Sequence, residues 1–463
     1  MIARLSPQDL ITLWPDEVGC LQDMGVVATV GGRGPAADGA LLIDAVRARL
    51  GSRLYLAPRL RQVVHVPPPG LGRPLWVDAP AFDLAEHVRV HPLEPPGNEA
   101  ELLATVEGLR RQRLDRSRPL WQMWLLPGLS GGRIGVYVRV HHAMADGSAA
   151  VALLAALLDA VPDPAVGLAA PGASWVPAPP PTGGELFVDN LRRAGAGLGD
   201  AVAVCGRPSL LLRRARGAGS ASRHAWGEGL APRSSLNRPI GPDRRLAIVR
   251  SDFDHVRDAA RRHGATVNDI LLAAVAGGLR ELLRGRGEEV AGLTLRAWVP
   301  VALPHRREER RQGNALGQMI VPLPLDVTDP VRRLGLIAGE TAELRRTAGR
   351  RRAPVLRSRA LQRAAMTVAA HQRAANVYVA NVHGPVAPLY LAGAPVLEVV
   401  PVVPLLGNFT LGVGALSYVG QFAVMAVGDR SGCPDLPVFT DAVDADLQAL
   451  TSVTPARSHL VDQ

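Results

Sequence analysis

The chain has 463 residues, about three times the common size of a domain, so two hydrophobic cores are expected rather than one. Hydrophobic residues make up 47% and charged residues 20%, a globular composition that excludes wholesale disorder. The net charge of +10 comes from arginine alone, since the sequence contains no lysine. Two arginine clusters, 306–311 and 345–352, carry no interleaved aromatic residues for stacking bases, so no nucleic-acid partner is expected.

The cysteines and the apolar segments indicate the compartment. The sequence has three cysteines, Cys20, Cys205 and Cys433. They form no C-x-x-C pair, so neither a disulfide framework nor a thiolate metal site is expected. The start, Met1–Trp14, includes Asp9 and lacks the apolar core of a signal peptide, which favours a cytoplasmic protein. The longest apolar stretch, 394–427, contains a glutamate, prolines and glycines, and therefore predicts buried strands rather than a membrane-spanning helix.

The first part of the chain, residues 1–165, alternates helical and extended patterns, for example a helix at 40–50 and a strand at 132–140. Residues 166–235 begin with a segment rich in proline, alanine and glycine, which is typical of a linker. They continue with an amphipathic, basic pattern at 185–216 that predicts a helix. This helix either connects the two domains and packs across their junction or rests on a lipid surface, and both interpretations stay open.

The third part, residues 236–463, repeats the α/β texture of the first. Hydrophobic patterning predicts one helix at 266–283 and strands at 246–253, 293–301 and 315–325. We therefore expect a second α/β domain after the linker.

Two adjacent histidines follow directly on the predicted strand 132–140. Side chains alternate along a strand, so His142 shares a face with the valines at 136, 138 and 140, while His141 lies on the opposite face. Desolvation on the apolar side keeps the pKa of an imidazole near or below neutrality, and such a neutral ring can accept a proton. His142 is therefore predicted to be a general base, and loss of His141 is expected only to weaken activity.

An acid and a glycine follow the histidines at short spacing. Asp146 either forms a salt bridge that shapes the loop or caps a helix that begins near Gly147 and continues to Leu158. We expect a structural role for Asp146 rather than proton transfer. The complete pattern His-His-x-x-x-Asp-Gly resembles the motif of the CoA-dependent acyltransferase superfamily, which includes chloramphenicol acetyltransferase, carnitine acyltransferases and peptide-synthetase condensation domains.

Within that superfamily the chain is similar to the bacterial wax ester synthase/diacylglycerol acyltransferase family over most of its length. The resemblance rests on Leu5–Asp9, on Gly72–Val77 with Phe82–Leu84 and His87, on Leu114–Trp121 with its Pro119-Leu120-Trp121 segment, on Thr266–Leu271 with Asn268-Asp269, and on Val299–Val301 followed by Gly313-Asn314. It implies catalytic roles for His142, His141 and Asp146, and substrate binding by Gly147, Asn268, Asp269 and Asn381. Helix capping is the alternative for the Asn-Asp pair.

Some positions depart from the family pattern. Where the family shows Ser-Asn-Val-Pro-Gly-Pro, this chain has Ala380-Asn381-Val382-His383-Gly384-Pro385, a change that bears on acceptor preference or rate. Gln122 replaces an acid after the Pro-Leu-Trp segment. A separate match to the hydrolase pattern G-x-S-x-G, at 128–132, lies between two predicted strands rather than between a strand and a helix, so Ser130 is expected to be a turn residue.

The resemblance implies two chloramphenicol-acetyltransferase-like domains with the active-site channel at their interface. It further implies transfer of a long acyl group from acyl-CoA to diacylglycerol or to a long-chain alcohol, with no metal and no resident cofactor. Peripheral contact with the inner membrane leaflet or with lipid inclusions is expected. The alternatives are an acyltransferase for a specialised alcohol or polyketide, a carrier-dependent condensation domain, and a lipid-droplet binding protein without turnover.

Overall fold

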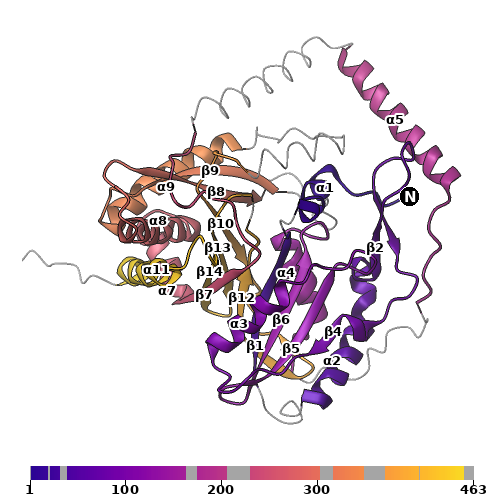
Figure 1. Cartoon of the computed structure of the whole chain (residues 1–463), viewed down its shortest axis with the longest axis horizontal. Coiled ribbons are helices and arrows are strands. Elements are labelled where there is room, and N and C mark those ends of the chain that lie inside the picture. Colours follow the sequence, from indigo (N-terminus) through magenta and orange to yellow (C-terminus); the bar gives the residue numbers. More distant parts are fainter. Residues whose placement is uncertain are drawn as a thin grey trace, which may run out of the picture.

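The computed structural model describes residues 2–18, 21–31, 39–162, 175–205, 230–302, 316–348, 371–405 and 407–452. Within these ranges two six-stranded sheets lie side by side, each covered by helices, and a separate sheet of two strands belongs to the first half of the chain (Figure 1). The mixed α/β class predicted from the sequence is confirmed.

The first sheet is built mainly from the first half of the chain. Its strands, in spatial order, are β11 (Tyr390–Leu391), β12 (Ala394–Val402), β1 (Asp23–Val30), β6 (Arg133–His141), β5 (Trp121–Leu129) and β4 (Val88–Val90). Alternating side chains of β6 divide between two cores, because Val136, Val138 and Val140 pack with α2 (Gly39–Arg53) and α4 (Gly147–Leu157). On the opposite face Tyr137 packs with residues of α3 (Glu99–Arg110).

A tight connection joins β5 and β6 into a hairpin. Gly131 and Gly132 adopt φ angles of 76° and 67°, a region that favours glycine because it has no Cβ. Ser130 therefore lies in a turn between two antiparallel strands, as expected from the sequence, and not in a nucleophile elbow.

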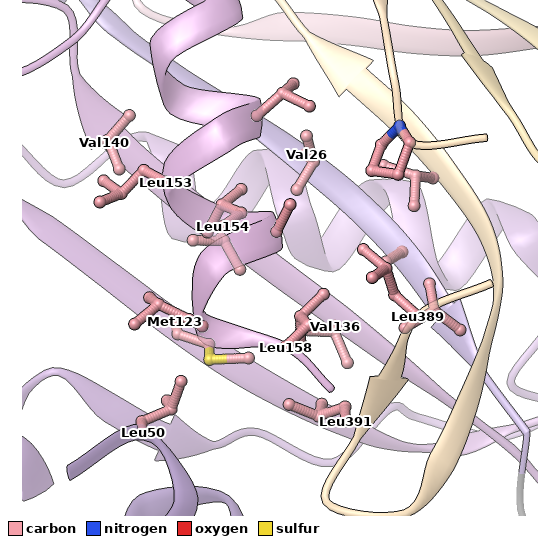
Figure 2. Close-up of a pocket in the computed structure, with 18 of the residues that line it drawn as sticks. Val26, Leu50, Met123, Val136, Val140, Leu153, Leu154, Leu158, Leu389 and Leu391 are labelled. Atoms are coloured by element: carbon pink, nitrogen blue, oxygen red, sulfur yellow. The ribbon is translucent and has the colours of Figure 1, made fainter. Parts of the chain in front are cut away.

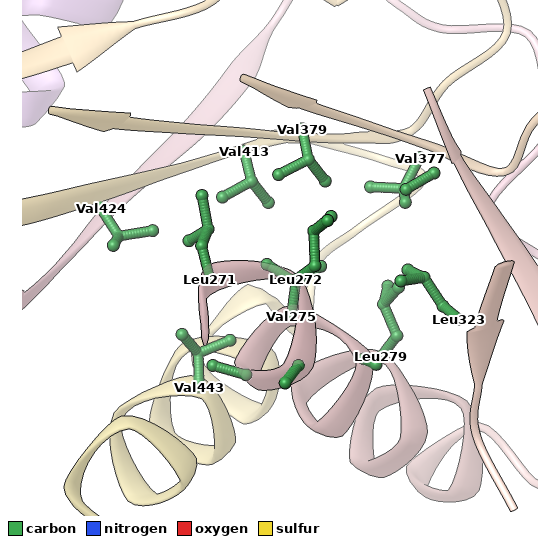
Figure 3. Packing of buried hydrophobic residues seen from close by; sticks show 14 of the residues in the cluster. Leu271, Leu272, Val275, Leu279, Leu323, Val377, Val379, Val413, Val424 and Val443 are labelled. Carbon is green, nitrogen blue, oxygen red and sulfur yellow. The ribbon is translucent and has the colours of Figure 1, made fainter. Parts of the chain in front are cut away.

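The second sheet forms the larger core. Its strand order is β7 (Arg244–Asp252), β14 (Gln421–Asp429), β13 (Leu411–Tyr418), β10 (Val377–His383), β8 (Thr294–Ala302) and β9 (Leu316–Pro324). The helices of this domain are α7 (Phe253–Arg262), α8 (Val267–Gly285), α9 (Pro330–Ala348) and α11 (Leu436–Thr451). Helix α8 lies between the sheet and α11, and its residues 270–276 are completely buried (Figure 3). The helix and strands predicted for this half are confirmed, with bounds shifted by one or two residues.

One strand crosses from the second half of the chain into the first sheet. Strand β12 pairs antiparallel with β1, for example at Gly25 with Val402 and at Val27 with Val400. The predicted division of the chain into 1–165 and 236–463 therefore does not include this strand exchange between the domains. Residues 390–402 belong to the second part of the chain but complete the sheet of the first domain. Turn chemistry alone does not reveal such a crossover, since the strand pattern at 394–402 fits either sheet.

The remaining elements flank the first domain. Helix α1 (Pro7–Leu13) starts with a capping box between Ser6 and Asp9, and β2 (Gln62–His65) pairs with β3 (Leu75–Asp78). Helix α5 (Gly183–Cys205) extends away from both sheets in Figure 1 and overlaps the helix predicted at 185–216, of which residues 206–216 lie outside the described residues. None of the described helices is both long and apolar enough to cross a membrane.

Candidate active site

The two histidines lie where β6 ends. His142 is half-buried, and its backbone N–H donates to the Gln22 carbonyl oxygen at 2.9 Å, which adds one rung to the ladder between β1 and β6. The residues before it on the same face, Val138 and Val140, line an apolar cavity. The alternation of the strand therefore directs His142 toward the cavity side of the sheet.

His141 is enclosed by protein. Its side chain has 0% exposure, Nε2 lies 2.9 Å from Asp16 Oδ2, and Nδ1 accepts the Ala143 backbone N–H at 3.0 Å. Both ring nitrogens are thus engaged with protein groups. Such a ring can position its neighbours, but it has no surface left to offer to a substrate.

Asp146 caps the helix that follows the histidines. Its Oδ1 accepts the Ala149 backbone N–H at 2.9 Å, and α4 begins at Gly147. The cap is one of the two structural roles considered for Asp146, and the structure shows it. At Gly147 a Cβ would come within 3.3 Å of Val382 Cγ2, so glycine allows the second domain to approach the loop closely.

Strand β10 brings the second domain to the histidine loop. Since Val382 lies against Gly147, alternation places Ala380 and Tyr378 on that same side and Asn381 on the side of α8. Desolvation, and after it the nearby charge of Asp146, raises the pKa of Tyr378 to about 12, so its phenol stays protonated at neutral pH. Asn381 is half-buried, and its substrate-binding role stays a prediction.

The Asn-Asp pair lies in the first turn of α8. Asp269 has 0% exposure and completes a capping box with Thr266, whose backbone N–H donates to Asp269 Oδ2 at 2.8 Å. Asp269 Oδ1 accepts from the Thr341 hydroxyl at 2.7 Å, and Arg345 donates to Oδ2 at 3.2 Å. The structure thus gives Asp269 a capping role, whereas Asn268 is half-buried and its predicted contact with substrate stays open to test.

The Pro-Leu-Trp segment builds part of the cavity wall. Leu120 is completely buried, and Trp121 donates its indole N–H to the Leu60 carbonyl oxygen at 2.8 Å. The Trp121 ring stacks on His87 at 4.7 Å between centroids, and burial lowers the pKa of His87. Pro119 precedes them, and the predicted structural role of the segment agrees with this packing. The other predicted pair, Gly313-Asn314, lies outside the described residues.

An apolar cavity of about 870 Å³, partly open to solvent, lies between α4 and the first sheet (Figure 2). Figure 2 shows Val136 and Val140 of β6, Leu153 and Leu154 of α4, and Leu389 from the second half of the chain around this space. No charged residue is among those that line it. The hydroxyl of one lining residue, Tyr418, is occupied, because it accepts the Leu389 N–H at 2.9 Å and donates to the Val396 carbonyl oxygen at 3.1 Å.

Two residues that hold the histidine loop, Asp16 and Gln22, were not predicted from the sequence. Asp16 lies 125 residues before His141 in the chain and contacts it only through the fold. No spacing rule connects residues so far apart, and Asp16 by itself looks like any acid in a short turn. Only an assigned pairing of β1 with β6 would have brought them together.

Comparison with known proteins identifies the class. The structure superposes on the wax ester synthase/diacylglycerol acyltransferase from Marinobacter aquaeolei with a TM-score of 0.69. The two chains are 25% identical, and the match covers 97% of this chain and 100% of that chain. The first condensation domain of the calcium-dependent antibiotic synthetase shares the fold, with a TM-score of 0.62 at 17% identity over 97% and 96% of the two chains. The two-sheet architecture thus defines a two-domain acyltransferase of the chloramphenicol-acetyltransferase type.

Sequence comparison identifies the family. The model of the wax ester synthase/diacylglycerol acyltransferase catalytic domain matches residues 5–271, and that of the family's C-terminal domain matches residues 312–451. The chain belongs to the wax ester synthase/diacylglycerol acyltransferase family. It is 32% identical over 421 residues to a putative diacylglycerol O-acyltransferase of Mycobacterium tuberculosis, covering 88% of this chain and 82% of the relative. A probable diacylglycerol O-acyltransferase of the same organism is 29% identical over 442 residues, covering 94% and 92%.

Proposed function

We propose that this acyltransferase moves a long acyl chain from acyl-CoA to diacylglycerol or to a long-chain alcohol, with His142 as general base. The observation that carries the proposal is the apolar cavity lined by Val140, which precedes His142 by two residues in the chain and points to the same face of the sheet. The residues that line the cavity are apolar except for the hydroxyl of Tyr418, which suits the burial of an acyl chain.

The proposed chemistry requires the imidazole of His142 to accept a proton from the acceptor hydroxyl. His142 removes the hydroxyl proton of the acceptor as the oxygen attacks the thioester carbonyl carbon, and it returns the proton to the departing CoA thiolate. The ester bond forms as the carbon–sulfur bond breaks, so neither a covalent acyl-enzyme nor a cofactor takes part. Base catalysis supplies roughly 10²- to 10⁴-fold. Positioning of the chain supplies more, since each buried CH₂ contributes about 0.8 kcal/mol.

The acceptor and the acyl donor are assigned by analogy with the relatives, which are named diacylglycerol O-acyltransferases and wax ester synthase. A specialised alcohol, or an acyl group delivered on a carrier protein as in condensation domains, is the competing substrate assignment. The fold accommodates either, because function resides in the site and not in the fold.

Release of free CoA from palmitoyl-CoA by the purified protein tests the proposal. Hexadecanol and dioleoylglycerol are offered separately, and His142→Ala is compared with His255→Ala, whose histidine is exposed on α7 in the second domain. We expect acceptor-dependent release that falls by about 10²- to 10⁴-fold in His142→Ala and is unchanged in His255→Ala. No release with either acceptor would favour a specialised substrate or a lipid-binding protein without turnover.

We also propose peripheral contact with lipid through α5. Phe187, Val188 and Leu191 share one side of this helix and are 56%, 43% and 62% exposed, while Leu186 packs into the protein. Sedimentation with phosphatidylglycerol vesicles should decrease by about tenfold in Phe187→Ser/Leu191→Ser, since both apolar groups are lost. Equal sedimentation of the variant and the parent protein would leave α5 as a connecting helix only.

A further inference from the structure

A buried carboxylate outside the motif contacts the histidine pair. Asp16 lies in a short 3-10 helix, Pro15–Val18, and only 1% of its side chain is exposed. Its Oδ2 lies 2.9 Å from His141 Nε2, and the His141 side chain is completely buried. Placing a carboxylate in such surroundings costs free energy unless hydrogen bonds satisfy it, so its partners indicate what it holds in place.

The contacts of the His141 ring fix its tautomer. Because Nδ1 accepts the Ala143 backbone N–H at 3.0 Å, that nitrogen carries no proton. The ring proton therefore lies on Nε2 and is donated to Asp16. The Asp16 carboxylate thus holds the His141 ring in the orientation in which Nδ1 accepts the backbone N–H of Ala143, the residue after His142.

The other oxygen of the carboxylate acts on the chain at His142 itself. Asp16 Oδ1 accepts the Gln22 backbone N–H at 2.9 Å, and the Gln22 carbonyl oxygen accepts the His142 backbone N–H at 2.9 Å. A single side chain thereby determines the hydrogen bonds of two successive peptide groups. One is the N–H of His142, and the other is the N–H of Ala143 that follows it.

We infer that Asp16 is a positioning residue for the reaction, which acts through His141 and Gln22 to fix the backbone from which the His142 imidazole projects. The inference rests on the proposed role of His142 as base. Proton abstraction requires the imidazole within hydrogen-bond reach of the hydroxyl, and a misplacement of about 1 Å costs on the order of 10²-fold in rate. A residue that orients the peptide groups of His142 and Ala143 is therefore expected to affect turnover more than substrate affinity.

The variant Asp16→Asn tests this role because it changes hydrogen-bond donors and not shape. The amide oxygen can accept from Gln22, but the amide nitrogen then faces the Nε2 proton of His141. If His141 moves its proton to Nδ1, that proton faces the Ala143 N–H, so two donors oppose each other in either case. We expect kcat with palmitoyl-CoA and hexadecanol to fall by about 10- to 100-fold, with the KM for palmitoyl-CoA changed by less than about threefold.

Asp429→Asn is the matched control. Asp429 is also fully buried and pairs with Arg244 at 3.3 Å. It is the last residue of β14, whereas Ala423, which pairs with Leu416 and through it lies level with Val382, is near the start of that strand. This variant should lower Tm and leave kcat within about twofold, since it breaks a buried ion pair without touching the loop at His142.

Two further measurements keep the inference testable if Asp16→Asn fails to fold. The variant His141→Gln keeps an N–H donor toward Asp16 but loses the acceptor for Ala143, so kcat should fall as in Asp16→Asn. In the protein labelled with ¹⁵N at histidine, one ring should show the Nε2–H tautomer and lose its resonance in His141→Gln. Detection of the Nδ1–H tautomer for that ring would overturn the inference.

A double-mutant comparison separates positioning from a merely structural role. When His142→Ala already lacks the base, adding Asp16→Asn should not reduce the residual rate further. The same fold reduction in both backgrounds, or kcat within about twofold of the parent in folded Asp16→Asn and His141→Gln, would overturn the positioning role. Full turnover in His142→Ala would instead refute the proposed base, and the positioning role with it.

Discussion

The two domains contain the same local unit, packed in two different ways. In the first domain the β5–β6 hairpin is followed by α4, and in the second the β13–β14 hairpin is followed by α11. Beneath α4 lies the apolar cavity (Figure 2). In the second domain α8 approaches α11 so closely that a Cβ at Gly278 would come within 2.6 Å of Val443 Cγ2, and Figure 3 shows the packed core around Val443.

The two hairpins also differ in the residues at their ends. After β6 the chain continues with His142, five residues before Gly147, where a Cβ would come within 3.3 Å of Val382 Cγ2 of the second domain. At the end of β14, Asp429 accepts the backbone N–H groups of Gly241 and Gly432, both at 2.7 Å, and pairs with Arg244. A carboxylate satisfied in this way stabilises a loop and has little capacity for chemistry. The same order of hairpin and helix thus accompanies tight packing in the second domain and an apolar cavity in the first.

Of the substitutions that test this comparison, one that fills the cavity should have the largest effect, on kcat/KM. Leu154→Trp adds bulk to the α4 wall of the cavity, and shortening the available space by about four CH₂ groups removes roughly 3 kcal/mol of chain burial. We expect kcat/KM for palmitoyl-CoA to fall by about 100-fold and that for octanoyl-CoA to change little. Equal losses for both chain lengths would mean that the chain does not lie in this cavity.

Crowding the second core should reduce stability instead of activity. Gly278→Ala places a methyl group against Val443 and the Phe439 ring and should lower the free energy of unfolding by about 1 to 3 kcal/mol. The matched variant Gly285→Ala has no neighbour within 4 Å of the new methyl group and should gain about 0.5 to 1 kcal/mol. Urea unfolding measures both, and stabilisation by Gly278→Ala would show that this core has unused space.

The smallest expected effect concerns pH. In the first domain the imidazole of His87 stacks on Trp121, whereas in the second the rings of Phe253 and Phe422 meet at a tilt of 32°. Burial lowers the pKa of His87, so its stabilisation is complete above about pH 6.5, the value for an unfolded histidine, and is lost as the pH falls below it. In His87→Phe the decrease of Tm between pH 7.5 and pH 5.5 should become smaller. An unchanged decrease would assign the acid sensitivity to other groups.

Sequence reasoning succeeded where structure depends on local pattern. Strand β6, the helix capped by Asp146, the turn at Ser130 and the helix of the Asn-Asp pair were each predicted from residues near one another in the chain. The acyltransferase family was identified from motifs of the same local kind and is confirmed by the family models.

What sequence reasoning missed depends on pairing between distant segments. The contact of Asp16 with His141 and the pairing of β12 with β1 each join parts of the chain that no local rule connects. The cavity was not predicted either, because valines facing a helix give the same pattern whether or not the helix lies tightly on them. The catalytic role of His142 itself stays a prediction until turnover is measured.

The crossover of β12 affects the order in which the protein can fold during synthesis. Strand β1 and the histidine loop leave the ribosome early, but the partner of β1 is complete only at Val402. The roughly 260 residues between His141 and Val402 take about 13 to 52 s to translate at 5 to 20 residues per second. During that interval β1 presents an unpaired edge that other nascent chains can join. The first sheet is therefore complete only after Val402 has been made, late in the synthesis of the chain.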